Sequence, residues 1–134
     1  DIAAPHTRSI LQESNIDPRA LVFIPVPLHP RRFRERGFNQ AQIIGQGLSA
    51  SCAARYTPLL FRRRATLPQA DLDEADRGVN IKRAFVLRDR TAIRNRYAVL
   101  IDDVATTGST LAECARTLYD AGAKEVWGMV LAKG

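Results

Sequence analysis

Apolar residues in this chain gather in short runs that are separated by polar and charged stretches. Branched and aromatic residues dominate the runs, which have the length and composition of buried strands. Pro25 and Pro27 place the end of the first strand at the rim of a sheet. The third run has the composition of a strand buried on both faces. The four strands predicted in this way cover residues 20–26, 84–87, 97–103 and 125–132.

Two longer stretches space their apolar residues as an amphipathic helix does. The first covers residues 40–54 and follows Asn39, a residue type that favours the N-cap. Gly45 and Gly47 lower its helix propensity. Its apolar positions are Ile43, Ile44, Leu48 and Cys52.

The second helix is predicted at residues 110–122, between the third and fourth strands. Thr110 and Glu113 have the spacing of a capping box, and Gly122 is a natural terminator. Strand, helix and strand at this spacing form a βαβ unit. We therefore expect an α/β fold, with a mostly parallel twisted sheet flanked by helices. Trp127 in the last strand is expected to pack in the core.

The remaining segments are polar. Residues 31–39 predict a charged loop that turns at Gly37. A short apolar piece at 57–61 precedes residues 62–80, which contain almost no large apolar side chain and predict a long exposed loop. A short helix at 72–77 is compatible with this loop, and another with the weakly patterned residues 1–19.

Length and composition indicate one ordinary globular domain over residues 1–134. The formal net charge is +6, and arginine supplies most of the positive charge. Arginine binds phosphate and carboxylate bidentately, which suits an anionic ligand, although a general preference for arginine codons explains the bias equally well. Cys52 and Cys114 are expected to be buried thiols. Without an apolar run of membrane-spanning length or a signal peptide, the chain is expected to be soluble and cytoplasmic.

The segment between the third strand and the second helix carries the candidate chemistry. It leaves the carboxyl end of a strand and enters the amino end of a helix, where unpaired N–H groups and the helix dipole favour a phosphate. Gly108 allows a backbone turn around an anion. Asp102 and Asp103 would repel phosphate but accept hydrogen bonds from a vicinal diol. The expected ligand is therefore a sugar phosphate, held also by Ala105, Thr106, Thr107, Ser109 and Thr110.

This segment is neither a P-loop nor a dinucleotide fingerprint, since it lacks glycine-lysine-Ser/Thr and has a single glycine. An ordinary strand-to-helix turn with a capping hydroxyl is the structural alternative. The sequence VLIDDVATTGSTL resembles the phosphoribosylpyrophosphate-binding motif of type I phosphoribosyltransferases. From about residue 22 to 134, the chain is similar to the ComF family, which comprises competence protein F and its GntX relatives. The stretch RGFNQ at residues 36–40 is characteristic of that family.

The resemblance implies a type I phosphoribosyltransferase fold and assigns further site residues. It places a pyrophosphate loop at residues 27–32, with Leu28, His29, Arg31 and Arg32. His29 could equally be a surface histidine beside prolines, whereas for the arginines contact with the ligand is favoured over a solvated patch. It places the catalytic loop of type I enzymes at 62–80, where Gln69, Arg77 and Asn80 match the family pattern. A surface loop with no role is the alternative. Many family members begin with a cysteine-rich zinc module, but no CxxC occurs here, so the chain either starts after such a module or lacks one.

The implied reaction transfers a phosphoribosyl group to a nitrogen nucleophile and releases pyrophosphate. Asp102, Asp103 and Arg77 are the expected catalytic residues, and Mg²⁺ is expected to arrive with pyrophosphate rather than on protein ligands. The acceptor stays open. A second hypothesis is a non-catalytic ligand-binding or accessory protein in DNA uptake, for which the positive charge allows non-specific contact with nucleic acid. Homo-oligomers are compatible with either hypothesis.

Overall fold

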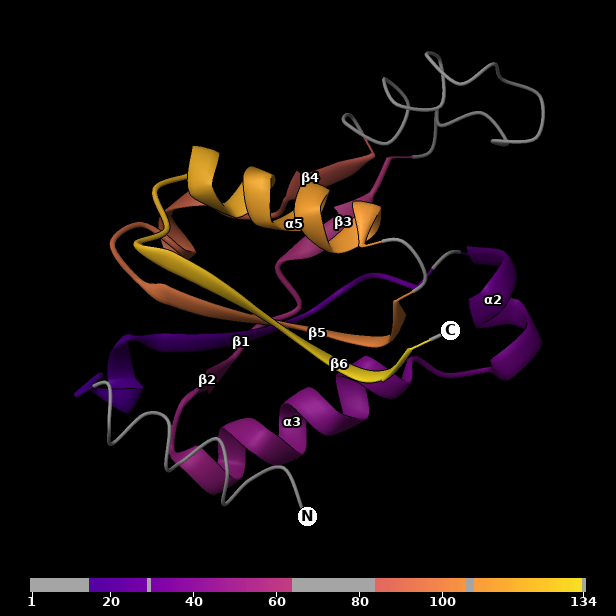
Figure 1. Cartoon of the computed structure of the whole chain (residues 1–134), viewed down its shortest axis with the longest axis horizontal. Coiled ribbons are helices and arrows are strands. Elements are labelled where there is room, and N and C mark those ends of the chain that lie inside the picture. The colour runs from indigo at the N-terminus through magenta and orange to yellow at the C-terminus, as the bar shows by residue number, and fades with distance from the viewer. Residues whose placement is uncertain (1–14, 29, 64–83, 106–107, 134) are drawn as a thin grey trace.

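The computed structural model describes residues 15–28, 30–63, 84–105 and 108–133, and its centre is a parallel sheet. The sheet has four strands in the order β2-β1-β5-β6, and every neighbouring pair is parallel. Figure 1 shows this sheet between two helices, one on each face. The predicted fold class, a mostly parallel sheet flanked by helices, is therefore confirmed. Its strands are β1 (Leu21–Pro25), β2 (Arg55–Tyr56), β5 (Tyr97–Ala105) and β6 (Glu125–Lys133).

The two central strands are predicted well because their composition allows burial on both faces. All residues of β1 are buried, and so are residues 98–101 of β5. The register pairs Leu21 with Tyr97 and Pro25 with Ile101, so both strands end at the same edge of the sheet. We call this edge the carboxyl rim. The two-residue strand β2 was not predicted, because a segment this short has no periodicity of its own.

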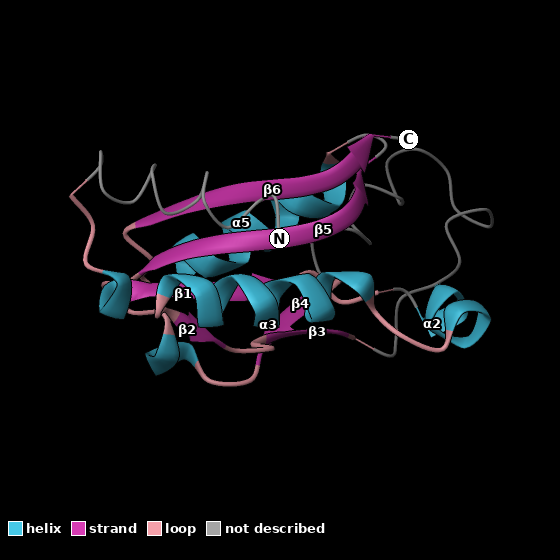
Figure 2. Ribbon diagram, turned by 90° about the horizontal axis from the view of Figure 1, so that it is seen from below, coloured by secondary structure: helices cyan, strands magenta, loops and turns pink. Residues whose placement is uncertain are grey.

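Helix α3 (Gln40–Cys52) covers one face of the sheet, against β1 and β5 (Figure 2). It begins where the sequence predicts: the Asn39 side chain accepts a hydrogen bond of 3.1 Å from the Ala41 N–H. The helix ends at Ala53, which takes a left-handed conformation. Its buried partners form one hydrophobic cluster with the sheet, made of Leu21, Phe23, Ala41, Leu48, Cys52, Val99 and Ile101.

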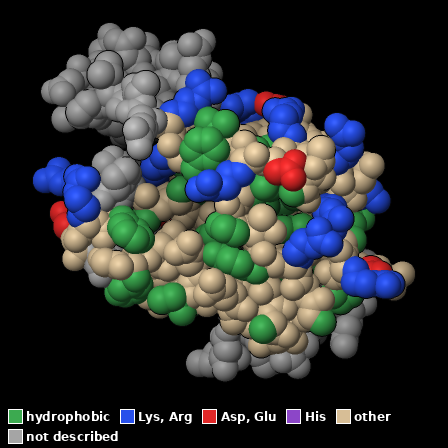
Figure 3. All heavy atoms as spheres, turned by 180° about the vertical axis from the view of Figure 1, so that it is seen from behind, with side chains coloured by type: hydrophobic (Ala, Val, Ile, Leu, Met, Phe, Trp, Pro, Cys, Tyr) green, Lys and Arg blue, Asp and Glu red, His purple; other side chains and the backbone are tan. Residues whose placement is uncertain are grey.

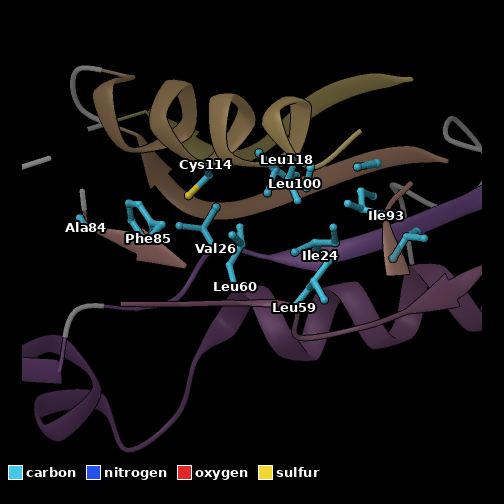
Figure 4. Packing of buried hydrophobic residues seen from close by; sticks show 13 residues of the cluster. Ile24, Val26, Leu59, Leu60, Ala84, Phe85, Ile93, Leu100, Cys114 and Leu118 are labelled. Carbon is cyan, nitrogen blue, oxygen red and sulfur yellow. The ribbon is translucent and has the colours of Figure 1, made fainter. Parts of the chain in front are cut away.

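Helix α5 (Ser109–Asp120) covers the opposite face together with a small second sheet. That sheet pairs β3 (Leu60–Arg62) with β4 (Phe85–Leu87) in antiparallel fashion. Figure 4 shows Leu60 and Phe85 packed under α5 with Val26 and Cys114. Gly122 ends the helical segment with φ +100°, as predicted. Short 3₁₀ helices at Pro18–Ala20 (η1) and Arg90–Ala92 (η3) complete the described elements.

The charged loop predicted at 31–39 is wrong for most of its length, because α2 occupies Pro30–Arg36. Proline suits the first helical position, where its missing N–H is not needed. Arg31 and Glu35 form an exposed i,i+4 ion pair at 3.8 Å. Gly37 then ends the helix with φ +78°, and its N–H donates to the Phe33 carbonyl at 2.7 Å. The sequence contained the start and stop signals, but the helix has no apolar stripe to reveal it.

Trp127 is not in the core, which corrects a second prediction. It is 37% exposed, and its ring stacks on Tyr97 with 5.8 Å between centroids. The reason is lateral position: β6 is the edge strand, and α3 packs on β1 and β5 instead. Both cysteines are buried thiols, as expected.

Candidate functional site

The candidate site is the junction between β5 and α5 at the carboxyl rim. Gly108 is the N-cap of α5, with φ +79° and ψ −5°, so the predicted left-handed turn is present. Its carbonyl accepts the Ala112 N–H at 2.9 Å. Gly108 and Ser109 are exposed and Thr110 is half-buried, so the start of the helix is open to solvent. Because glycine has no side chain to cap the helix, the first amides of α5 keep the geometry that favours an anion.

The capping box predicted from Thr110 and Glu113 is wrong. The helix starts one residue earlier, at Ser109, so Thr110 already lies inside it. Glu113 is buried and instead forms an ion pair with Arg116, one turn further along α5. The amino end of α5 is thus not closed by a reciprocal cap, which is consistent with a binding role for this end.

Asp102 lies beside the junction, on the α5 side of the sheet. In β5, Leu100 belongs to the hydrophobic cluster under α5, and Ile101 belongs to the cluster with α3. Because successive side chains of a strand point to opposite faces of the sheet, Asp102 is on the α5 face again. Asp102 is half-buried and opposite Val130 of β6. Its negative charge acts on two nearby groups. The pKa of Cys114 is raised mainly by burial, and Asp102 adds to that increase. The pKa of Arg62 is lowered by burial, and Asp102 opposes that decrease.

The segment after β1 reaches the same rim. The Val26 N–H donates to the Ile101 carbonyl at 2.8 Å, so this segment continues alongside β5 up to Asp102. Asn39 fixes it from the other side, because its buried side-chain amide donates to the Val26 carbonyl at 3.2 Å while its oxygen caps α3. Leu28 comes next along the rim, half-buried, and Arg31 is exposed on α2.

The structure therefore brings together the two predicted loops at neighbouring strand ends. Besides Gly108, the predicted site residues that are described with their side chains are Asp102, Ser109, Thr110, Leu28 and Arg31. Asp103, Ala105 and Arg32 are described by their backbone alone. The predictions that lie outside the described residues concern Thr106, Thr107, His29, Gln69 and Arg77.

Arg62 is a residue at this site that the sequence did not single out. It was expected to begin an exposed loop, but it is the last residue of β3 and is half-buried. Its Nε donates to the Pro27 carbonyl at 3.2 Å. The sequence offered no signal for this contact, because its partners are far away along the chain.

The described part of the chain contains no group of three or more histidine, cysteine or acidic side chains that could hold a metal ion. Within the same residues, no helix has both the length and the apolar character needed to cross a membrane.

Comparison with known sequences identifies relatives that cover most of this chain. DNA utilization protein YhgH of Escherichia coli O6:H1 is 42% identical over 107 residues, which are 78% of this chain and 46% of that protein. Competence protein F of Haemophilus influenzae is 39% identical over 113 residues, 81% of this chain and 49% of the relative. The chain thus spans about half the length of the curated relatives it matches. No family model matches the sequence.

Comparison with solved structures identifies the fold. Glutamine phosphoribosylpyrophosphate amidotransferase from B. subtilis superposes with a TM-score of 0.58 at 18% identity, over 92% of this chain and 24% of that one. A hypoxanthine phosphoribosyltransferase from Staphylococcus aureus superposes with a TM-score of 0.55 at 15% identity, over 96% of this chain and 59% of that one. The resemblance seen in the sequence is confirmed: over most of its length the chain is similar to proteins of the ComF family, and it has the type I phosphoribosyltransferase fold.

Proposed function

We propose that this domain binds phosphoribosylpyrophosphate, or a related ribose 5-phosphate, and transfers its phosphoribosyl group with release of pyrophosphate. One observation carries the proposal. At a single sheet edge, the open start of α5 with Gly108 in the left-handed conformation lies next to the half-buried Asp102. An anion-binding helix end beside a carboxylate suits a ligand that has both a phosphate and a diol.

The 5′-phosphate would bind at the start of α5. Amides and hydroxyls of Ala105, Thr106, Thr107, Gly108, Ser109 and Thr110 supply the donors in this proposal. Asp102 and Asp103 accept hydrogen bonds from the two ribose hydroxyls and stabilise the positive charge that develops at the ring in an oxocarbenium-like transition state.

Pyrophosphate would bind beside the sugar, at the end of β1. Leu28, His29, Arg31 and Arg32 form this part of the proposed site, and Gln69 and Arg77, from the segment that follows β3, add contacts. Mg²⁺ would arrive bound to pyrophosphate oxygens, whose charge it neutralises. In the reaction, a nitrogen nucleophile forms a bond to the anomeric carbon, and the carbon–oxygen bond breaks with its electron pair going to pyrophosphate. No protein nucleophile is required, so the residues act by positioning and charge.

The acids give the sharpest test. In the double variant Asp102→Asn with Asp103→Asn, we expect the affinity for ribose 5-phosphate to fall at least tenfold, because each amide replaces an acceptor oxygen by a donor and removes the charge. Isothermal titration calorimetry measures the affinity, and thermal unfolding checks that the variant still folds. A folded variant with unchanged affinity would contradict the role of the acids. Pyrophosphate release with a panel of nitrogenous bases then tests catalysis itself.

A second candidate function is an accessory, non-catalytic role in DNA uptake. The names of the relatives, which mention competence and DNA utilization, and the net charge of +6 favour it. Non-specific binding through phosphate neutralisation weakens steeply with salt. Salt-dependent DNA binding without pyrophosphate release from any base would support this role over the transferase. Both candidates are compatible with a cytoplasmic protein.

A further inference from the structure

The half-buried Arg62 connects three parts of the chain at the carboxyl rim. Its Nε donates to the Pro27 carbonyl at 3.2 Å, at the start of the segment assigned to pyrophosphate. Its guanidinium carbon stands 4.8 Å from the centroid of the Phe85 ring, on β4. The register places Arg62 opposite Phe85, at the end of β3 that is followed by residues 64–83.

Partial burial of the Arg62 guanidinium costs free energy unless a negatively charged group compensates its charge. Burial lowers the pKa of Arg62, and the neighbouring Cys114 and Asp102 oppose that effect. Burial raises the pKa of the Cys114 thiol well above neutrality, so the thiol carries no charge under ordinary conditions. Asp102 is therefore the carboxylate that acts on Arg62, and the arginine remains a cation between the two halves of the proposed ligand site.

Apolar packing fixes the frame around Arg62. Figure 4 shows Val26, Leu60 and Phe85 below α5, near its Cys114, so the end of β1 and the small sheet pack against the helix proposed to bind phosphate. Among the described residues, Nε is the one nitrogen of this guanidinium with a hydrogen-bond partner. A cation stacked on a rigid aromatic ring and bonded to a backbone carbonyl holds that carbonyl in a defined position.

A second arginine in the same small sheet provides a comparison. Arg88 stands over Phe61 at 5.3 Å, at the opposite end of the pairing, and it is exposed. No side-chain bond to a backbone carbonyl accompanies this contact in the described part of the chain. Stacking on an aromatic ring is thus common to both arginines, whereas the bond to Pro27 and the influence of Asp102 distinguish Arg62.

We propose that Arg62 is a positioning residue for the pyrophosphate half of the site. By holding the Pro27 carbonyl, Arg62 fixes the position of residues 27–32 relative to Asp102, the carboxylate proposed to bind the ribose. Pyrophosphate and sugar can then bind at the same time with the correct relative orientation. This inference rests on the proposed function and extends it to a residue that does not touch the sugar phosphate. It predicts that substitution of Arg62 lowers the affinity for the pyrophosphate half of the ligand and not for the sugar-phosphate half.

The test compares two half-ligands by calorimetry: magnesium pyrophosphate and ribose 5-phosphate. In Arg62→Met, which keeps an apolar side chain against Phe85 but removes the donor and the charge, the affinity for magnesium pyrophosphate should fall at least tenfold. The affinity for ribose 5-phosphate should change less than threefold. Arg62→Lys keeps a cationic donor and should recover most of the lost affinity. The matched control Arg88→Met should leave both affinities unchanged.

Three results would overturn the inference. Unchanged pyrophosphate affinity in Arg62→Met would exclude the positioning role, and a parallel loss of both half-ligands would show a merely structural one. An Arg62→Lys variant no better than Arg62→Met would also contradict it, and this variant gives the answer if Arg62→Met does not fold. If the wild-type protein binds neither half-ligand, the proposed function itself fails. If the wild-type protein binds ribose 5-phosphate and magnesium pyrophosphate but the Arg62 variants bind them equally well, only this inference fails and the proposed function stands.

Discussion

At the scale of single residues, a few backbone positions determine where a ligand could be held. Gly37 and Gly108 have nearly the same left-handed conformation, with φ +78° and +79°. A Cβ added at either position meets no atom within 4 Å. Their places in the fold differ, because Gly37 ends α2, whereas Gly108 begins α5 beside Asp102. This pair makes it possible to separate backbone strain from ligand binding.

We predict that Gly108→Ala weakens ribose 5-phosphate binding and that Gly37→Ala does not. Both variants place a Cβ in a left-handed conformation, which costs about 1–2 kcal/mol, so both should lose a similar amount of stability. Only Gly108→Ala alters the turn that orients the first amides of α5. Urea unfolding measures the stability and calorimetry the affinity. Equal affinities in the two variants would show that the Gly108 turn does not orient the phosphate.

The sequence located the junction between β5 and α5 better than it located the surroundings of Pro27. Gly108 and Asp102 belong to one continuous strand-to-helix segment, so their proximity can be inferred from local sequence. Arg62 reaches Pro27 across 35 positions, and that contact depends on how the small sheet packs. A site residue whose partners are distant in sequence leaves no periodicity or motif to detect.

At the scale of elements, prediction succeeded for helices and strands whose own apolar residues indicate which side chains are buried. Strands β1 and β5 were predicted because they are continuous apolar runs, and helices α3 and α5 because their apolar residues recur at helical spacing. Helix α2 was missed because its one large apolar side chain, Phe33, forms no stripe, and β2 because it exists only through pairing with β1. Gly45 and Gly47 lowered the expectation for α3, yet the helix runs through both.

Gly45 has a packing role that the sequence did not reveal. A Cβ at this position would lie 2.9 Å from Cε1 of Tyr56 and 3.2 Å from Cδ1 of Ile101. Helix α3 can therefore approach the sheet closely only because no side chain is present. Gly47, two residues later on the same helix, is exposed.

We predict that Gly45→Val lowers the free energy of unfolding by about 1–3 kcal/mol, because the inserted side chain overpacks the layer between α3 and the sheet. Gly47→Val should change it by less than about 0.5 kcal/mol, as surface substitutions usually do. Urea denaturation of both variants provides the comparison. Similar losses in the two variants would contradict the close-packing explanation, because valine has a higher helix propensity than glycine and only Gly45 contacts the sheet.

At the scale of the whole molecule, the sheet separates two hydrophobic layers, and each contains one cysteine. Cys114 lies on the buried face of α5 and is 0% exposed, in the layer shared with β1, β4 and β5. Cys52 is the last residue of α3 and is 6% exposed. Figure 3 shows that most of the charged side chains on the face drawn there are Lys and Arg. The lateral order of the strands governs what these layers cover, which is why the exposure of Trp127 could not be predicted.

The two thiols should report different opening events. Labelling of Cys114 requires separation of α5 from the sheet and the small sheet, so in a Cys52→Ala variant its opening free energy should equal the global free energy of unfolding. Labelling of Cys52 requires only that the last turn of α3 opens, and helix ends open with lower free energies. In a Cys114→Ala variant, Cys52 should therefore react at least tenfold faster than global unfolding of that variant predicts. Thiol alkylation at several urea concentrations, compared with urea unfolding of each variant, measures both quantities. If Cys114 also reacts faster than global unfolding allows, then α5 opens by itself, and the element that begins at the proposed phosphate site is not fixed by the core.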